Sequence, residues 1–190
     1  MRLKSKGTPG YIKNRKLARG AAVIIGAALI IAIFLTGYIT TKTRNNLLTI
    51  GAILAVLPTA KFAVLFIMLL PYHSQPREAY DEVVGACGGR AQVLAETVLT
   101  TTEKVMPVDF FVIKDNCIIG YTANKKCDIP FTERFLSENM KQNGHRVTVK
   151  IWDDKKKFLS RISSLAAAES KDGQEERDRE IAGTVLSLVL

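Results

Sequence analysis

A run of 22 consecutive residues without a charged side chain, Gly20 to Thr41, restricts the possible folds of this chain more than any other feature. A helix rises about 1.5 Å per residue, so this run would be about 33 Å long, close to the roughly 30 Å of a bilayer hydrocarbon core. A cleaved signal peptide would have an apolar region of about 7–15 residues followed by a small-x-small cleavage site. The exit sequence TGYITTKTR lacks that site. We therefore expect an uncleaved transmembrane helix over about residues 20–41.

A second apolar segment, Asn45 to Tyr72, follows a short polar turn at about residues 42–46. Two helices joined so briefly form an antiparallel hairpin, and both ends of a hairpin face the same side of the membrane. Residues 1–19 hold seven Lys and Arg, the turn holds two, and neither segment contains an acidic residue. The positive-inside rule therefore predicts a multi-pass protein of the cell membrane, with two spans at about 20–41 and 46–72 and both termini cytoplasmic.

Lys61 is the one charged residue within the second predicted span. A charge at the bilayer centre costs at least about 2.5–3.5 kcal/mol on insertion scales, which makes Lys61 a candidate functional residue. In one interpretation the side chain reaches the cytoplasmic headgroups, with Pro58 bending the helix. In the other it pairs with a partner's carboxylate or a lipid phosphate.

Small residues recur four positions apart in both apolar segments, which allows close packing of helices. These pairs are Ala22–Gly26, Ala28–Ala32 and Gly51–Ala55. We expect them to pack the two helices of the hairpin against each other rather than to form a dimer interface.

The net charge of +9 belongs to the membrane end of the chain. From Phe62 onward there are 17 basic and 18 acidic residues, a balance of −1. A domain that binds duplex DNA should itself be basic, because neutralising phosphates drives the binding. Residues 73–190, enough for one compact domain, are therefore not expected to have a nucleic-acid partner.

The cysteines and histidines do not form a metal-binding pattern. Cys87, Cys117 and Cys127 are too few for a disulfide framework, and His73 and His145 lie far apart, with no CxxC, HxxxH or HxH pair. We predict neither a bound metal nor a cofactor. Cytoplasmic thiols stay reduced, and without a neighbouring histidine these are expected to be buried or inert rather than nucleophilic.

Hydrophobic periodicity predicts the elements of the soluble domain. These are a helix at 74–89, a second helix at 90–101, a β-hairpin of 108–114 and 117–122 around Asp115-Asn116, a helix at 130–143 capped by Asp128, a strand at 146–152, a helix capped by Asp153 or Asp154, a charged connector at 170–179 and a helix at 180–190. The predicted fold is an N-terminal transmembrane α-hairpin followed by a small α/β (α+β) cytoplasmic domain. Its order is α-α-β-β-α-β-α-α, with a mixed sheet of about three strands covered by helices. The helix between the second and third strands would form a right-handed crossover if those strands are parallel.

Asp109, inside an apolar predicted strand, is the leading candidate for chemistry. A strand carboxylate followed by a hairpin and a helix resembles the layout in which restriction-endonuclease-like domains hold metal. That family also needs a second acid two residues before a lysine on the next strand, and residues 119–122 supply none. Without it there is no plausible magnesium site for phosphodiester hydrolysis. The remaining weak catalytic candidates are Asp109 with Lys125 or Lys126, but period-2 strand geometry favours a solvent-facing aspartate as the first interpretation of Asp109.

One basic cluster stands out in the soluble domain, formed by Lys155, Lys156 and Lys157 with Lys150 and Arg161. A solvated helix face is the first interpretation of this cluster. Contact with anionic lipid headgroups is the second.

Several segments carry a resemblance over most of the chain: GTPGYI, LLTIGAILAVLPTAKF, MPVDFFVI, CIIGYTANKK and RVTVKIW. With them the chain resembles a group of small uncharacterised two-helix membrane proteins of Firmicutes, some of which carry the label O-linked GlcNAc transferase-like. The transferase of that label is built from tetratricopeptide repeats and a large nucleotide-sugar domain, and neither fits this chain. The resemblance therefore implies a bacterial membrane protein and transfers no functional residue.

Two functional hypotheses from different classes follow. The first is a non-catalytic, membrane-anchored interaction or sensing module, whose partners are the lipid bilayer and a protein that contacts the hairpin or the soluble domain. The alternative is a membrane-tethered enzyme, nuclease-like or transferase-like, with an unrecognised site. The missing second acid and the lack of a nucleophile–base pair favour the first. The ligand and the oligomeric state stay open.

Overall fold

The computed structural model describes residues 5–43, 46–89, 91–101, 104–168 and 173–190, which divide into two compact units. One unit is formed by Met1–Tyr11 together with Ser74–Leu190, and the other is Ile12–His73. The predicted tail, residues 1–19, is therefore divided between the units, with residues 5–11 in the first and residues 12–19 in the second. Predictions that involve Arg2, Lys4, Arg44 and Arg90, and part of the predicted connector at 170–179, lie outside the described residues.

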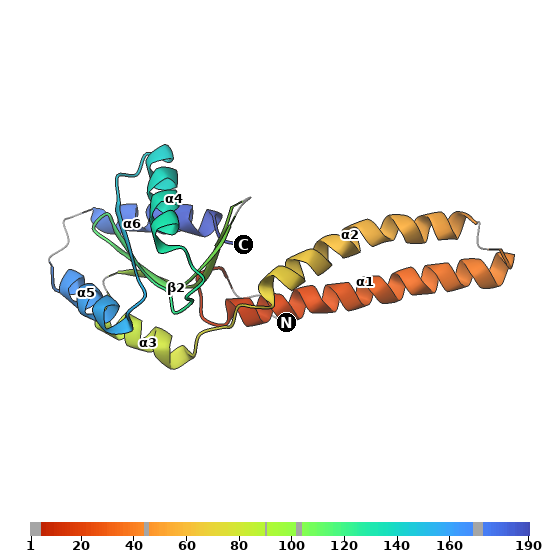
Figure 1. Ribbon diagram of the computed structural model, residues 1–190, viewed down its shortest axis with the longest axis horizontal. Coiled ribbons are helices and arrows are strands. Elements are labelled where there is room, and N and C mark those ends of the chain that lie inside the picture. Colours follow the sequence, from red (N-terminus) through yellow and green to blue (C-terminus); the bar gives the residue numbers. More distant parts are fainter. Residues whose placement is uncertain (1–4, 44–45, 90, 102–103, 169–172) are drawn as a thin grey trace. The chain divides into compact units, whose positions relative to one another are not determined.

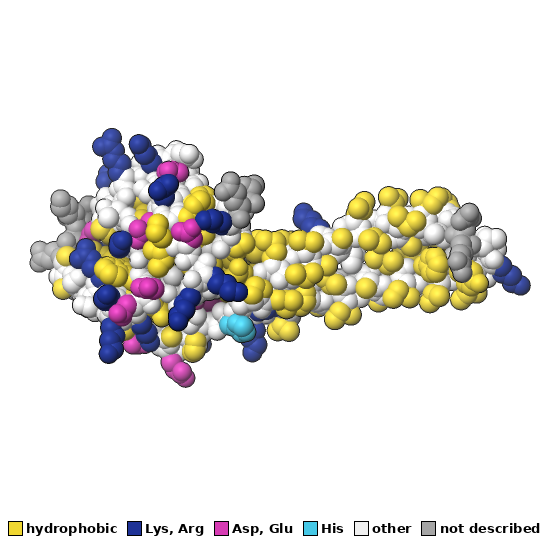
Figure 2. Space-filling view, in the orientation of Figure 1, with side chains coloured by type: hydrophobic (Ala, Val, Ile, Leu, Met, Phe, Trp, Pro, Cys, Tyr) yellow, Lys and Arg dark blue, Asp and Glu magenta, His cyan; other side chains and the backbone are white. Residues whose placement is uncertain are grey.

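Among the described residues, two helices are long and apolar enough to cross a membrane: α1 (Tyr11–Thr41) and α2 (Leu47–Leu69). Only 6% and 11% of their most apolar windows are buried, and Figure 2 shows apolar side chains over the outside of both helices. A core helix of a water-soluble protein would bury this surface, so the pattern favours contact with lipid. Helix α1 begins well before the predicted residue 20, because the basic run after Tyr11 contains no helix breaker.

Basic side chains in the first turns of α1 bind carbonyl groups at the end of α2. Lys16 Nζ donates to the carbonyl oxygens of Leu70, at 2.9 Å, and Tyr72, and Arg19 Nη1 donates to the carbonyl of Leu65 at 3.1 Å. The last carbonyls of a helix lack intrahelical donors and form the negative end of its dipole. Lys16 therefore satisfies carbonyl groups beyond the last turn of α2, which would be costly to leave unpaired in an apolar setting, and Arg19 adds a hydrogen bond to the helix at Leu65.

Glycine permits close contact between α1 and α2 at two positions. A Cβ atom on Gly26 would lie 2.6 Å from Thr59 Oγ1, and one on Gly37 would lie 2.7 Å from Asn46 Oδ1. Gly26 thus makes the close helix contact expected for the Ala22–Gly26 pair. Gly51 has open space around its Cβ position, so it does not make such a contact.

The soluble unit contains the elements α3 (Arg77–Ala86), β1 (Gln92–Thr100), β2 (Val105–Lys114), β3 (Cys117–Tyr121), α4 (Ile129–Gln142), β4 (Thr148–Trp152), α5 (Lys155–Ala167) and α6 (Gln174–Ser187). Its sheet has the order β1-β2-β3-β4, with β1/β2 and β2/β3 antiparallel and β3/β4 parallel. The sheet is mixed, as predicted. In the described residues it has four strands, so the predicted three strands and the predicted order are wrong.

The error lies in the helix predicted at residues 90–101, because residues 92–100 form strand β1. Both faces of this strand are covered, and all side chains from Leu94 to Leu99 are buried. A strand buried on both faces lacks the polar–apolar alternation that identifies a half-buried one, and its apolar residues also match helical spacing. The observed order of the soluble unit is therefore α-β-β-β-α-β-α-α.

Gly7, before α1, and Leu190, after α6, bind the outer edge of β1. The N–H of Ala95 donates to the carbonyl of Gly7 at 2.8 Å, and the N–H of Leu190 donates to the carbonyl of Val98 at 3.0 Å. An uncovered edge strand would present unpaired backbone groups to other chains. The residues preceding α1 and those following α6 therefore have a structural role in this unit.

The turn and caps predicted from local sequence are confirmed. Asp115 and Asn116 have φ angles of 50° and 60°, as a two-residue type I′ hairpin requires. Asp128 caps α4 by accepting the N–H of Phe131 at 3.1 Å, and Asp154 caps α5 by accepting the N–H of Lys156 at 2.8 Å.

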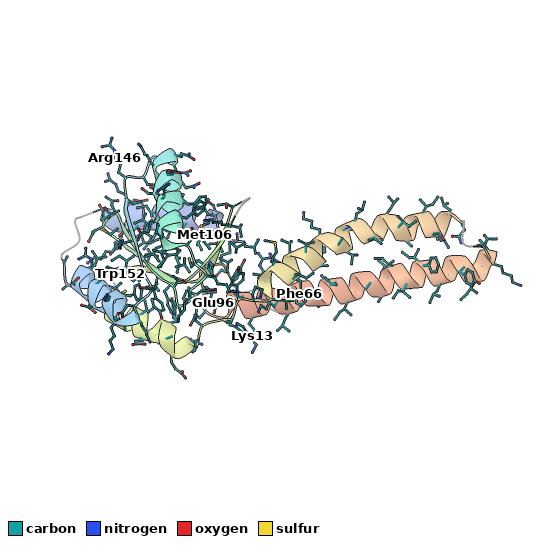
Figure 3. All side chains as sticks on the ribbon, viewed as in Figure 1. Lys13, Phe66, Glu96, Met106, Arg146 and Trp152 are labelled. Atoms are coloured by element: carbon teal, nitrogen blue, oxygen red, sulfur yellow. The ribbon has the colours of Figure 1, made fainter. Side chains whose placement is uncertain are left out.

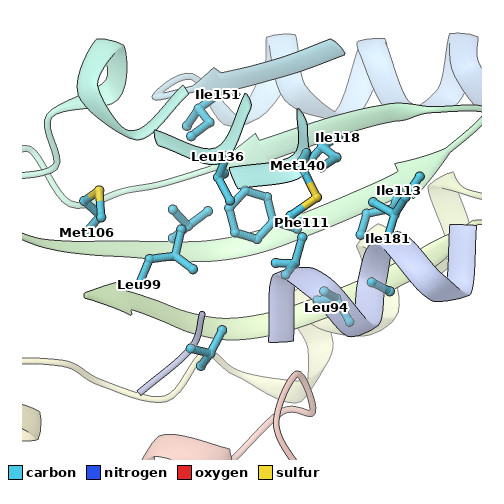
Figure 4. Packing of buried hydrophobic residues seen from close by; sticks show 14 of the residues in the cluster. Leu94, Leu99, Met106, Phe111, Ile113, Ile118, Leu136, Met140, Ile151 and Ile181 are labelled. Atoms are coloured by element: carbon cyan, nitrogen blue, oxygen red, sulfur yellow. The ribbon is translucent and has the colours of Figure 1, made fainter. Parts of the chain in front are cut away.

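Helices cover both faces of the sheet, α4 and α6 on one and α3 and α5 on the other (Figure 1). Between the sheet and the first pair lies a core that includes Phe111, Leu136 and Met140, all at 0% exposure (Figure 4). The Phe111 ring packs over Gly120 so closely that a Cβ there would lie 2.9 Å from a ring carbon.

Candidate functional site

Two carboxylates lie at the same level of the β1–β2 ladder, Glu96 on β1 and Asp109 on β2. They fall between the paired residues Ala95–Phe110 and Thr97–Val108. Glu96 has a φ angle of 54°, in the left-handed region, which costs a residue other than glycine about 1–2 kcal/mol. Such a conformation persists only where surrounding contacts stabilise it.

Those contacts are hydrogen bonds to the Glu96 carboxylate, which is 2% exposed. Oε1 accepts the N–H groups of Gly10 at 2.5 Å and Gln75 at 3.2 Å, and Oε2 accepts the hydroxyl of Ser74 at 3.0 Å. Glu96 therefore fixes the residue before α1 and the residues before α3. Sequence analysis missed Glu96 because it was placed on a helix. An acid in the middle of the apolar run QVLAETVLT is the signal that could have found it.

Asp109 is half-buried, and both of its carboxylate oxygens accept hydrogen bonds. Oδ1 accepts from Gln75 Nε2 at 2.6 Å, and Oδ2 accepts from the N–H of Ala123 at 2.6 Å. Burial raises the pKa of Asp109, and these two hydrogen bonds oppose that rise. The solvent-facing aspartate that the sequence favoured is half-buried in the structure, where Gln75 and the N–H of Ala123 each bind one of its carboxylate oxygens.

A cavity of about 470 Å³ opens beside this loop, at the carboxyl ends of the parallel strands β3 and β4. In open α/β sheets, ligands bind at the carboxyl ends of the strands. The lining residues are Thr122, Ala123, Asn124, Lys125, Cys127, Asp128, Ile129, Pro130 and Asp153. The predicted candidate Lys125 therefore lines the cavity, while Lys126 is not among its lining residues. Asp109 is linked to the cavity lining by the hydrogen bond that it accepts from the N–H of Ala123.

The cavity wall carries charges of both signs. Asp128 is engaged by the helix cap and by Lys104 Nζ at 2.6 Å, and the hydrogen bond from Lys104, followed by that from the Phe131 N–H, lowers the pKa of Asp128. Lys125 and Asp153 make no hydrogen bond or ion pair with any residue that the structure describes. These two side chains are the charged groups with which the cavity could bind a ligand.

The three thiols are protonated at neutral pH. Burial raises the pKa of Cys87 to about 11, and it also raises the pKa values of Cys117 and Cys127. Cys127 lines the cavity, with its Sγ 3.7 Å from Thr132 Oγ1. A thiol reacts as a nucleophile in its thiolate form, so the protonated Cys127 is poorly suited to attack a bound molecule.

The described residues contain no group of three or more His, Cys, Asp and Glu side chains that could hold a metal ion. Strand β3, next to Asp109, ends in Ile119, Gly120 and Tyr121, which supply no second carboxylate. The arrangement can thus position donors and acceptors around a ligand, and strand β3 adds no second carboxylate beside Asp109.

The other candidates lie apart from the cavity lining. Lys61 is exposed on α2. Lys155, Lys156 and Lys157 form the exposed first turn of α5, where Lys155 pairs with Glu82 at 2.6 Å. Lys150 pairs with Glu133 at 3.2 Å. The predicted basic cluster is therefore partly neutralised by neighbouring acids.

Compared with known proteins, the chain matches no protein-family model, no curated sequence and no solved structure.

Proposed function

We propose that this protein is a non-catalytic module, anchored in a bacterial cell membrane by α1 and α2, that binds a ligand or a partner through the cavity at the carboxyl ends of β3 and β4. The observation that carries the proposal is the double hydrogen bonding of Asp109. A general base must have a lone pair directed at the substrate proton. Each Asp109 carboxylate oxygen keeps a second lone pair, but Gln75 binds one oxygen and Ala123 binds the other, so in this structure the group links strand β2 to the cavity loop.

The remaining groups at the cavity support binding rather than reaction. The Cys127 thiol has a raised pKa, and Asp128 is already engaged by Lys104 and by α4. Lys125 and Asp153 have opposite charges and line the same cavity. A peptide segment that carries both an acidic and a basic group matches this pair, because each charge gains an opposite partner.

The test uses full-length protein in lipid nanodiscs and an array of short peptides that carry acidic and basic residues. We expect Lys125→Glu to lose the peptides that the wild type binds. Lys126→Glu is the matched control, because its side chain is not among those lining the cavity, and it should keep them. Binding that is equal in all three proteins, or absent from all three, would contradict the proposed site.

The alternative is a membrane-tethered enzyme. One observation favours it: the strand carboxylate Asp109 is followed by a hairpin and by α4, and its bonded loop leads to Lys125. Incubation with plasmid DNA and Mg²⁺, or with nucleotide sugars, decides between the two functions. We expect no product in either case. Product formed by the wild type and lost in Asp109→Asn would establish the enzyme.

A further inference from the structure

A second depression lies at the other end of α4, where the chain turns into β4. It has a volume of about 500 Å³ and is lined by Ser137, Lys141, His145, Arg146, Val147 and Thr148. It is separate from the first cavity, since it adjoins the amino end of β4 and the first cavity adjoins the carboxyl end. Figure 3 shows Arg146 at the periphery of the soluble unit.

The charge of this depression is one-sided. Lys141 and Arg146 contribute two cations, and among the described residues no Asp or Glu lines it. Neither cationic side chain makes an ion pair or hydrogen bond with a described residue. Glu138 lies three positions before Lys141 on α4, but it is neither a lining residue nor paired with that lysine. Two neighbouring like charges repel, and a bound anion would relieve the repulsion.

A tight backbone turn lies between the two cationic residues in the sequence. The N–H of His145 donates to the carbonyl of Met140 at 2.8 Å, and the N–H of Gly144 donates to that of Lys141 at 3.1 Å. With Gly144 at a φ of 82°, this is a Schellman motif, the commonest glycine ending of a helix. The turn sets His145 and Arg146 directly after α4, whose last turn carries Lys141, and all three residues line the depression.

The other lining groups add hydrogen-bond donors. Ser137 and Thr148 contribute hydroxyl groups, and the half-buried His145 contributes an imidazole whose Nε2 lies 3.5 Å from Thr184 Oγ1. A guanidinium binds two oxygens of a phosphate at once, and an ammonium adds a point charge. Together these groups match a tetrahedral oxyanion better than a neutral or cationic ligand.

We propose that this depression is a phosphate-binding site, with Lys141 and Arg146 as the charged contacts and Ser137 and Thr148 as hydroxyl donors. The phosphate belongs either to a soluble phosphorylated molecule or to an anionic lipid headgroup. The proposal does not depend on the function of the cavity at the carboxyl ends of β3 and β4.

The chain contains two histidines, His73 and His145, which allows a local readout. Full-length protein with isotope-labelled histidine is placed in phosphatidylcholine nanodiscs and titrated with inorganic phosphate at constant pH and ionic strength. We expect the ring signals of His145 to shift with saturation, while those of His73 stay in place. A His145 shift that does not saturate, or equal shifts of both histidines, would overturn the proposal.

The double variant Lys141→Gln/Arg146→Gln is expected to bind phosphate at least about tenfold more weakly, because two charge-assisted contacts are lost. Lys155→Gln/Lys156→Gln removes the same charge elsewhere and should bind like the wild type. Equal weakening by both double variants would indicate a general charge effect and overturn the site.

A second arm distinguishes the two sources of phosphate. If the His145 signals already lie at their bound position in phosphatidylglycerol nanodiscs without added phosphate, the site takes a lipid headgroup. If they move only on addition of phosphate, it takes a soluble ligand. Both results support the site.

Discussion

The side-chain amide of Gln75 donates a hydrogen bond to Asp109 at 2.6 Å, joining the segment before α3 to the middle of strand β2. The backbone N–H of the same glutamine binds Glu96 at 3.2 Å, so one residue connects both carboxylates of the β1–β2 ladder. Through Ala123 the same Asp109 side chain also fixes the cavity loop. The Asp109 carboxylate therefore joins three segments that are distant in sequence, and its removal should lower the free energy of unfolding.

Asp109→Asn should lower the free energy of unfolding of the full-length protein by about 1–3 kcal/mol, because its amide NH₂ must face either the Gln75 amide or the Ala123 N–H. Denaturant titration followed by fluorescence measures the loss. Asp81→Asn, on the exposed face of α3, is the control and should change stability by less than about 0.5 kcal/mol. Equal effects of the two substitutions would contradict the role of Asp109.

Gly120→Ala should destabilise the soluble unit by about 1–3 kcal/mol, because its Cβ would lie 2.9 Å from Phe111 and 3.0 Å from Ile151. Gly183→Ala is the matched control. Its Cβ would have open space inside helix α6, so a gain of about 0.5–1 kcal/mol is expected. Thermal unfolding of the two variants should move in opposite directions, and a loss of stability in both would contradict the packing argument.

Asp178 should make stability depend on pH. Its side chain is 5% exposed, burial raises its pKa, and the backbone N–H of Asp115 donates to Oδ2 at 3.1 Å. Between the unfolded and the folded pKa values, Asp178 is therefore protonated in the folded state and ionised in the unfolded state. Its contribution to stability is fully present below the unfolded pKa and is lost as pH rises through the folded pKa. The Asp115 carboxylate and Lys114 act on the same group, the first raising and the second lowering its pKa.

Asp178→Asn removes this titration while keeping an acceptor for the Asp115 N–H. The unfolding free energy of the wild type, measured relative to the variant, should therefore fall as pH increases from about 4 to 7. Denaturant titrations at several pH values provide the comparison. A difference that stays constant, or grows in favour of the wild type, would show that Asp178 does not titrate in this way.

Both termini are predicted to be cytoplasmic, from the seven basic residues before residue 20 against two in the turn. A green fluorescent protein fused after Leu190 should fluoresce, and alkaline phosphatase at the same position should be inactive. Phosphatase fused after Lys42 is the control and should be active. The opposite pattern at the two positions would reverse the proposed topology.

Lys61→Leu is expected to leave membrane insertion intact or improved, because it removes a charge that costs at least about 2.5–3.5 kcal/mol at the bilayer centre. Carbonate extraction measures insertion, and pull-downs from detergent with the wild type, Lys61→Leu and Lys61→Arg show whether a partner depends on the charge. A partner lost selectively from Lys61→Leu, and only weakened with Lys61→Arg, would show that Lys61 pairs instead of reaching the headgroups.

Sequence alone determined the features that depend on a chain segment and its immediate neighbours. The two long helices follow from the length of their apolar runs, since a segment of this kind in a membrane must satisfy its own backbone groups. The Asp115-Asn116 turn and the Asp128 cap follow from the φ angles and hydrogen bonds that these residue types favour within a few positions.

Tertiary structure decided the features that depend on what a segment packs against. Residues 92–100 fit both helical and strand spacing, and pairing with β2 together with burial of both faces selects the strand. The bonds from Gln75 to Glu96 and Asp109 cross 21 and 34 positions of sequence, and the two cavities form only where strand ends and helix ends meet. The local sequence pattern carries no information about contacts between distant segments, because the burial and hydrogen bonding of such segments are properties of the whole fold.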